Sequence, residues 1–141
     1  MDADDLARRC AERMYADDAA SQALGITITE VARGTAIASM KVRDEMVNGH
    51  GICHGGFVFT LADTAFAFAC NTYDDVTVAA GADITFLHPV DGGTELTATA
   101  IELARRGRSG LYDVTVRTGD GTAVAEFRGR SRSLGRRLLA D

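Results

Sequence analysis

The chain has 141 residues, which is enough for a single domain over residues 1–141 with its own hydrophobic core. It is 46% hydrophobic and 25% charged, a composition typical of soluble globular proteins, and its net charge of −5 argues against a general nucleic-acid binder. The three cysteines form no C-x-x-C pair, so we interpret them as free thiols in a reducing compartment.

The N-terminal sequence and the hydropathy pattern bear on location. Residues 1–5 are acidic where a secretory signal would be basic, and no apolar run reaches the length of about 18 residues that a membrane span needs. We therefore expect a cytoplasmic protein that does not enter a membrane.

Hydrophobic periodicity and turn residues predict short segments around one long apolar helix. In chain order we expect helices over residues 3–15 and 17–24, strands over 26–31 and 35–42, a loop over 44–48, a helix over 57–72, and strands over 77–87, 94–103, 111–118 and 122–133. A basic loop is expected over 105–110, and a loose tail from Leu134. Tight turns between consecutive strands favour an antiparallel sheet, and only the long helix is apolar enough to fill its concave face. The sequence thus predicts an α+β fold, a curved antiparallel sheet wrapped around one central helix with an N-terminal helical cover.

The central helix contains a single ionisable residue, Asp63. The helix is hydrophobic nearly all round and should be buried, so the carboxylate loses hydration that something must replace. One interpretation is a structural aspartate that accepts backbone hydrogen bonds or pairs with a cation. The other is a catalytic carboxylate, and the residue type alone does not decide between them.

Gly55, at the start of this helix, is the nearest candidate for stabilising negative charge. The free N–H groups and the positive end of the helix dipole favour an oxyanion there. Asp63 comes eight residues later, which is roughly 12 Å along the axis, too far for both residues to act on one small carbonyl. If they cooperate, they belong to different chains, and the pattern then predicts a symmetric dimer with composite sites.

The glycine-rich segment over residues 48–56 carries further polar candidates. It fits neither the P-loop nor the dinucleotide-binding fingerprint, and the chain has no G-x-S-x-G motif. The spacing of His50, Cys53 and His54 matches no metal signature, so we expect no metal. Asn48 and His54 either hydrogen-bond the substrate or anchor the loop, and both interpretations stay open.

An arginine stripe, Arg128, Arg130 and Arg132, lies at period two in the final predicted strand and therefore on one face. Such a stripe is either a solvated surface or a site for a polyphosphate ligand.

Three segments resemble the hotdog-fold acyl-CoA thioesterases of the phenylacetic-acid-degradation (PaaI) type. They are NGHGICHGGFVFTLADTAFAFACN at residues 48–71, DITFLHP at 83–89 and FRGRS at 127–131, and the resemblance spans roughly residues 10–134. It implies a helix wrapped by five or six strands, dimers whose sheets join, and usually a homotetramer of two dimers.

The resemblance also implies roles for individual residues. Gly55 N–H would polarise the thioester carbonyl, and Asp63 of the other subunit would act as nucleophile or as general base, with Asn48 and His54 orienting the site. Binding of the coenzyme A part of the substrate would involve His88, Arg128 and Arg130. Here His88 stands where relatives often have Arg, and Asp83 stands where many have a small polar residue. No cofactor is implied, because coenzyme A is part of the substrate.

The expected function is hydrolysis of aryl- or arylacetyl-CoA, such as phenylacetyl-CoA or hydroxyphenylacetyl-CoA, to the free acid and coenzyme A. The alternatives are a thioesterase of broader or medium-chain specificity and a non-catalytic acyl-CoA-binding protein in which Asp63 is structural. A hydratase or dehydratase is disfavoured, because it would need a histidine paired with an acid and no such motif appears beyond His54.

Overall fold

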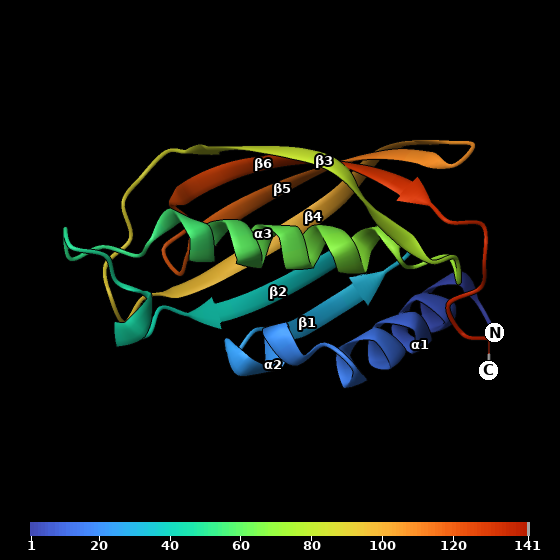
Figure 1. The fold of residues 1–141 in the computed structure, drawn as a ribbon, viewed down its shortest axis with the longest axis horizontal. Helices are drawn as coiled ribbons and strands as arrows, with labels where there is room; N and C mark the ends of the chain where they lie inside the picture. The colour runs from blue at the N-terminus through green and yellow to red at the C-terminus, as the bar shows by residue number, and fades with distance from the viewer. Residues whose placement is uncertain (141) are drawn as a thin grey trace.

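The computed structural model describes residues 1–140 and shows one curved sheet wrapped around a long helix (Figure 1). The helices are α1 (Ala3–Ala16), α2 (Ala19–Ala23), the 3-10 turn η1 (Asp44–Met46) and α3 (Gly55–Cys70). The strands are β1 (Thr27–Ala32), β2 (Thr35–Lys41), β3 (Thr77–Phe86), β4 (Glu95–Arg106), β5 (Ser109–Thr118) and β6 (Ala123–Ser133). The predicted order of elements is confirmed. Among residues 1–140, no helix has the length and apolar character needed to cross a lipid bilayer.

The six strands pair antiparallel in the order β1-β2-β4-β5-β6-β3. Consecutive strands form the hairpins β1–β2, β4–β5 and β5–β6, while β3 follows the central helix and pairs with β6 at the edge of the sheet. The other edge is β1, and Figure 1 shows α1 running alongside it. The sheet therefore has one edge flanked by a helix and one edge, β3, without such a cover.

The core lies between α3 and the concave face of the sheet. Small residues on β2 and β4 let the helix approach closely, and larger ones on β5 and β6 fill the remaining space. These inward-facing residues are Ala36, Ala38, Ala98, Ala100, Tyr112, Val114, Val116 and Phe127. They alternate with more exposed residues along each strand, as the period-two pattern predicts.

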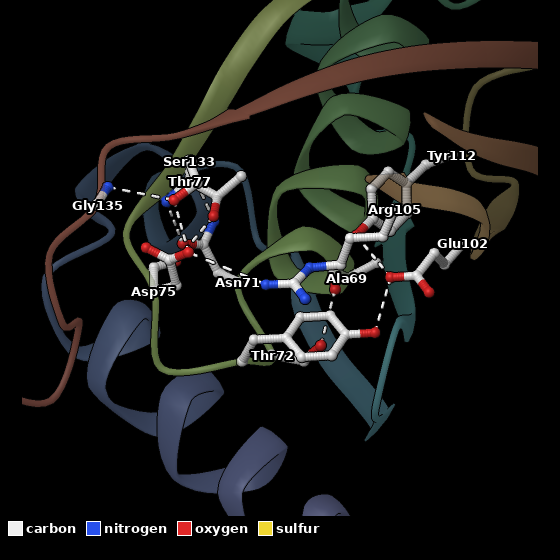
Figure 2. A network of polar contacts seen from close by, with 11 residues as sticks. Ala69, Asn71, Thr72, Asp75, Thr77, Glu102, Arg105, Tyr112, Ser133 and Gly135 are labelled. Carbon is white, nitrogen blue, oxygen red and sulfur yellow. Dashed lines mark hydrogen bonds and ion pairs between the residues drawn. The ribbon is translucent and has the colours of Figure 1, made fainter. Parts of the chain in front are cut away.

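Hydrogen bonds at the C-terminal end of α3 tie that helix to the sheet (Figure 2). The Asn71 amide donates to Ala67 O at 2.8 Å and to Thr77 O at 2.9 Å, and its Oδ1 accepts from Thr77 N at 2.9 Å. Thr72 Oγ1 donates to Ala69 O and accepts from Gly34 N, which belongs to the β1–β2 turn. These bonds fix the helix against the first hairpin and the start of β3.

A second group of contacts surrounds Glu102 on β4. Its Oε1 accepts hydrogen bonds from Tyr73 at 2.8 Å and from Tyr112 at 3.0 Å. Arg105 lies over the Tyr73 ring, 3.8 Å from its centroid. Burial raises the pKa of the Tyr112 hydroxyl, and the nearby Glu102 carboxylate raises it further. Both tyrosines therefore stay protonated and hold the segment after α3 against β4 and β5.

Three predictions about local structure were wrong. The basic segment 105–110 is not a loop, because β4 continues to Arg106, β5 starts at Ser109, and Gly107 with a φ of 60° makes a two-residue turn. The segment 44–48 contains the turn η1. The tail is not loose, since Leu134 N donates to Val76 O, Val76 N donates to Arg136 O, and Leu139 N donates to Asp74. These contacts hold the tail beside the turn that follows α3.

Candidate active site

His54 is the N-cap of α3 and therefore positions the start of the helix. Its ring Nδ1 accepts a hydrogen bond from Gly56 N at 3.0 Å, and its backbone N–H donates to Met46 O at 2.8 Å. Because Nδ1 is an acceptor here, this bond assigns the proton of a neutral ring to Nε2. The loop-anchoring interpretation holds for Nδ1, while Nε2 remains available as a donor on the exposed side of the ring.

Gly55 is the first residue of α3, so its N–H has no acceptor within the helix. None of the hydrogen bonds among residues 1–140 uses this N–H. A side chain at this position would meet the ring of Phe86, because an added Cβ would lie 2.9 Å from Phe86 Cζ. The N–H therefore lies at the positive end of a 16-residue helix, beside an aromatic ring, where an oxyanion would be stabilised.

Asp63 is half-buried in the middle of α3. Burial raises the pKa of its carboxyl above the ordinary value of 3.8. No hydrogen bond or ion pair to this carboxylate is found within residues 1–140, and desolvation alone shifts its pKa. The chain thus supplies neither the backbone donor nor the cation that a structural role within a single chain would need.

Asn48 closes the glycine-rich loop on itself. Its side-chain Oδ1 accepts from His50 N at 2.9 Å and from Ile52 N at 3.4 Å, and its backbone N donates to Ile52 O at 2.8 Å. The side-chain oxygen of Asn48 therefore anchors the loop. Its Nδ2 makes no hydrogen bond within residues 1–140 and can donate to another group.

The cysteines are poor nucleophiles in this setting. Cys53 and Cys70 are both buried, and burial raises the pKa of the Cys70 thiol to about 12 and that of Cys53 in the same direction. In residues 1–140 we find no cluster of three side chains suited to a metal ion.

The two principal residues, Gly55 and Asp63, do not meet within one chain. The helix is continuous from Gly55 to Cys70, so their eight-residue separation corresponds to about 12 Å. A groove of about 830 Å³ lies elsewhere, between α1 and β1, and none of its lining residues is a candidate for catalysis. Within this chain, α3 carries two separate groups, an N–H donor and an unpartnered carboxylate, and each is called a half-site below.

Comparison with known proteins decides the family. The thioesterase superfamily matches residues 50–125, which include both half-sites. The chain belongs to the thioesterase superfamily.

Relatives of this thioesterase resemble it over nearly the whole chain. Acyl-coenzyme A thioesterase PaaI of Escherichia coli is 44% identical over 131 residues, which cover 93% of this chain and 94% of the relative. The solved structure of the E. coli PaaI protein from the phenylacetic acid degradation operon has a TM-score of 0.95 and 41% identity, and the match covers 96% of this chain and 99% of that one. A putative esterase of Archaeoglobus fulgidus is 31% identical over 88% of this chain and 80% of its own. The resemblance to PaaI-type hotdog thioesterases is confirmed, and the enzyme is a thioester hydrolase.

The thioesterase places its arginine stripe on the convex face of the sheet, away from α3. Arg128 forms a two-pronged ion pair with Asp113, with Nε–Oδ1 at 2.7 Å and Nη2–Oδ2 at 3.0 Å. Arg130 pairs with Asp83 at 3.1 Å. Both guanidinium groups are exposed but partly neutralised, and they are not brought together with Gly55 or Asp63.

His88 lies two residues after β3 and is exposed. Its Nδ1 lies 2.7 Å from Pro89 O, which leaves Nε2 free to face solvent or a ligand. Phe86, which contacts the Gly55 position, was not among the residues selected from the sequence. A contact between residues 31 positions apart has no local signal in the sequence, although the segment that contains Phe86 belongs to the family resemblance.

Proposed function

We propose that the enzyme hydrolyses aryl- and arylacetyl-CoA thioesters, such as phenylacetyl-CoA or its ring-hydroxylated forms. The observation that carries the proposal is the half-buried Asp63 carboxylate, which has no partner in its own chain and lies on the same helix as the free Gly55 N–H. The relative named acyl-coenzyme A thioesterase PaaI supports the aromatic substrate class, because the solved structure is that of the E. coli PaaI protein from the phenylacetic acid degradation operon.

In the proposed mechanism the thioester carbonyl oxygen accepts a hydrogen bond from Gly55 N–H. Negative charge that develops on this oxygen is stabilised by the N–H and by the helix dipole. Asp63 of the other subunit then acts in one of two ways. As a general base it takes a proton from the water that attacks the carbonyl carbon, and as a nucleophile it forms an anhydride that water cleaves. In both routes the C–S bond breaks, the sulfur takes up a proton, and the free acid and coenzyme A leave.

The proposed dimer joins two copies at the β3 edge. A composite site needs the start of α3 near the interface, and Phe86 of β3 contacts that start at Gly55. The β1 edge is flanked by α1, which would block a second sheet (Figure 1). A two-fold axis beside β3 would bring each Asp63 toward the partner's Gly55. Assembly of two such dimers into a homotetramer is part of the same proposal.

Polar groups around the half-sites are proposed to orient the substrate. His54 Nε2 and Asn48 Nδ2 are free to donate to the thioester or to the attacking water. His88, Arg128 and Arg130 are proposed to bind the coenzyme A part, and the arginines would exchange their aspartate partners for phosphate. The reaction as written needs no cofactor.

The test is coenzyme A release from phenylacetyl-, hydroxyphenylacetyl-, benzoyl-, acetyl- and hexanoyl-CoA by the wild-type enzyme and by Asp63→Asn. We expect preferred turnover of the aryl thioesters and its loss in the variant. Preferred turnover of hexanoyl-CoA would favour the medium-chain alternative. Binding of every thioester without release would favour the acyl-CoA-binding alternative, and full activity of Asp63→Asn would contradict the role of Asp63.

A further inference from the structure

We propose that Phe86 forms a wall of the acyl pocket and gives the enzyme its preference for aromatic acyl groups. This inference rests on the proposed function, because it takes Gly55 N–H as the donor to the thioester carbonyl. Phe86 is the last residue of β3 and pairs with Ala125 of β6. Since Ala125 is fully buried, the pair points toward the concave side of the sheet, where α3 lies.

The Phe86 ring lies directly against Gly55. The three atoms nearest to an added Gly55 Cβ all belong to this ring, with Cζ at 2.9 Å, Cε1 at 3.3 Å and Cε2 at 3.4 Å. The outer edge of the ring therefore faces the first turn of α3, and no aliphatic or polar side chain lies between the ring and the glycine.

This ring is also accessible to solvent in the single chain. It is 54% exposed, although its neighbours on the same face of β3, Ile84 and Ala82, pack against the core. A phenyl ring that lies against the Cβ position of Gly55 and exposes half of its surface in the single chain offers apolar contact to a group attached to the carbonyl carbon, if Gly55 N–H binds the carbonyl oxygen as proposed. The acyl group is attached there, within a few ångströms of the oxygen that Gly55 binds.

An aromatic acyl group gains more from this wall than an aliphatic one. Two aromatic rings whose centroids lie about 4.5 to 7 Å apart attract each other in addition to the hydrophobic gain from buried apolar surface. This extra attraction corresponds to roughly a three- to tenfold change in a binding constant or a rate constant. The coenzyme A arm on the other side of the carbonyl is the same in every substrate. A wall that contacts the acyl side therefore changes the ratio of rates between acyl groups, whereas contact with the coenzyme A arm changes all rates together.

The test compares kcat/KM for phenylacetyl-CoA with kcat/KM for hexanoyl-CoA in four proteins. These are the wild-type enzyme, Phe86→Leu, Phe86→Tyr and Leu87→Ala. Leu87 is the matched control, since it is the next residue and also 54% exposed, but none of its atoms is among the three nearest to the Gly55 position. We expect the ratio to fall about threefold to tenfold in Phe86→Leu and to stay near the wild-type value in Phe86→Tyr and Leu87→Ala.

The outcomes separate this inference from the proposed function. The inference is wrong if Phe86→Leu keeps the wild-type ratio, or if it slows both substrates equally, because Phe86 then contacts the coenzyme A arm or only supports Gly55. A wild-type enzyme that prefers hexanoyl-CoA would have no aromatic preference for Phe86 to provide, and would overturn this inference together with the proposed substrate class. Absence of coenzyme A release from all thioesters by the wild-type enzyme would overturn the proposed function and this inference with it. Since Phe86 is half exposed, its variants are expected to fold, and a wild-type melting temperature checks that they do.

Discussion

At the scale of the residue, the environment of Asp63 links catalysis to stability. Burial raises the pKa of this carboxyl above 3.8, so its ionised form is less favourable in the folded chain than in the unfolded one. The stability contributed by the protonated group is fully present below pH 3.8 and is lost as the pH rises through the folded-state pKa. The aspartate therefore weakens the fold at neutral pH.

We predict that Asp63→Asn, which resembles the protonated side chain, raises the melting temperature at pH 7. The difference in melting temperature between the variant and the wild-type enzyme should shrink as the pH falls toward 3.8, because the aspartate becomes protonated and both side chains are then neutral. Asp120→Asn is the control of opposite sign, since the Thr118 hydroxyl and the Thr122 N–H lower the pKa of Asp120 to about 2. That variant should lose stability at pH 7. A lower melting temperature for Asp63→Asn than for the wild-type enzyme at pH 7 would show that burial of the ionised carboxylate does not weaken the fold.

Asp63→Asn should also lose activity by at least about a hundredfold, the usual contribution of a positioned acid or base. In the wild-type enzyme, kcat/KM should rise with pH through an apparent pKa above the ordinary carboxyl value, because Asp63 acts only when ionised. Initial rates of coenzyme A release across pH 4 to 8 measure both effects. Retention of more than a tenth of the wild-type rate would remove Asp63 from the mechanism.

At the scale of the element, Gly129 sets how closely α3 approaches β6. A Cβ at this position would lie 2.7 Å from two atoms of the Phe66 ring, which is itself buried on α3 and cannot swing aside. We predict that Gly129→Ala destabilises the fold by about 1–3 kcal/mol, the typical cost of overpacking. Gly119→Ala is the control, because nothing lies within 4 Å of its added Cβ. Urea unfolding measures both, and equal midpoints would show that Phe66 can move.

The contacts around Glu102 give a second prediction at this scale. Glu102→Ala leaves the buried Tyr112 hydroxyl without an acceptor. The missing hydrogen bond should lower the free energy of unfolding by about 1–3 kcal/mol, in addition to the effect of lost packing. In a Tyr112→Phe background the same substitution should cost less, because that hydroxyl is gone. Glu95→Ala, an exposed acid at the start of the same strand, is the control. Urea unfolding of the double-mutant cycle tests this, and an unchanged cost in both backgrounds would contradict a role for the Tyr112–Glu102 bond.

The sequence predicts the elements well where the pattern of burial is strong. The alternation of Tyr112, Val114 and Val116 predicts β5, and the apolar run after Gly55 predicts α3. The pattern fails at Arg105–Gly110, because exposed charged residues on a strand look like those of a loop. It also fails in the tail, whose order comes from hydrogen bonds to Asp74 and Val76, far away in the sequence.

In the candidate site, too, residues with a local sequence pattern can be predicted, and contacts between distant segments cannot. Asp63 can be found from the sequence because it is the only ionisable residue in an apolar helix, and Gly55 because it starts that helix. The pairing of Arg128 with Asp113 and of Arg130 with Asp83 depends on strand register, which the sequence does not specify. The contact of Phe86 with Gly55 depends on how β3 crosses the start of α3, so only the structure reveals it.

At the scale of the whole molecule, the proposed reaction requires two chains for each site. The length of α3 separates Gly55 from Asp63 in one subunit, and the open β3 edge lies beside Gly55. Two variants can divide the half-sites between subunits. Asp63→Asn removes the carboxylate. Gly55→Val places a branched side chain against the Phe86 ring, where an added Cβ alone would lie 2.9 Å from Cζ, and it is expected to crowd the place of the thioester carbonyl. The Phe86 ring is half exposed, so it can move and the fold of Gly55→Val is expected to persist.

Co-expression of these two variants, each expected to be inactive alone, followed by measurement of coenzyme A release, tests whether the two chains share each site. In a mixed dimer, the Gly55 of the Asp63→Asn chain meets the Asp63 of the Gly55→Val chain, so one of the two sites has the wild-type pair. Random assembly makes about half of the dimers mixed, and activity should therefore return to about a quarter of the wild-type value. Activity no higher than the mean of the two variants alone would show that each chain uses its own Gly55 and Asp63, and would contradict the composite site.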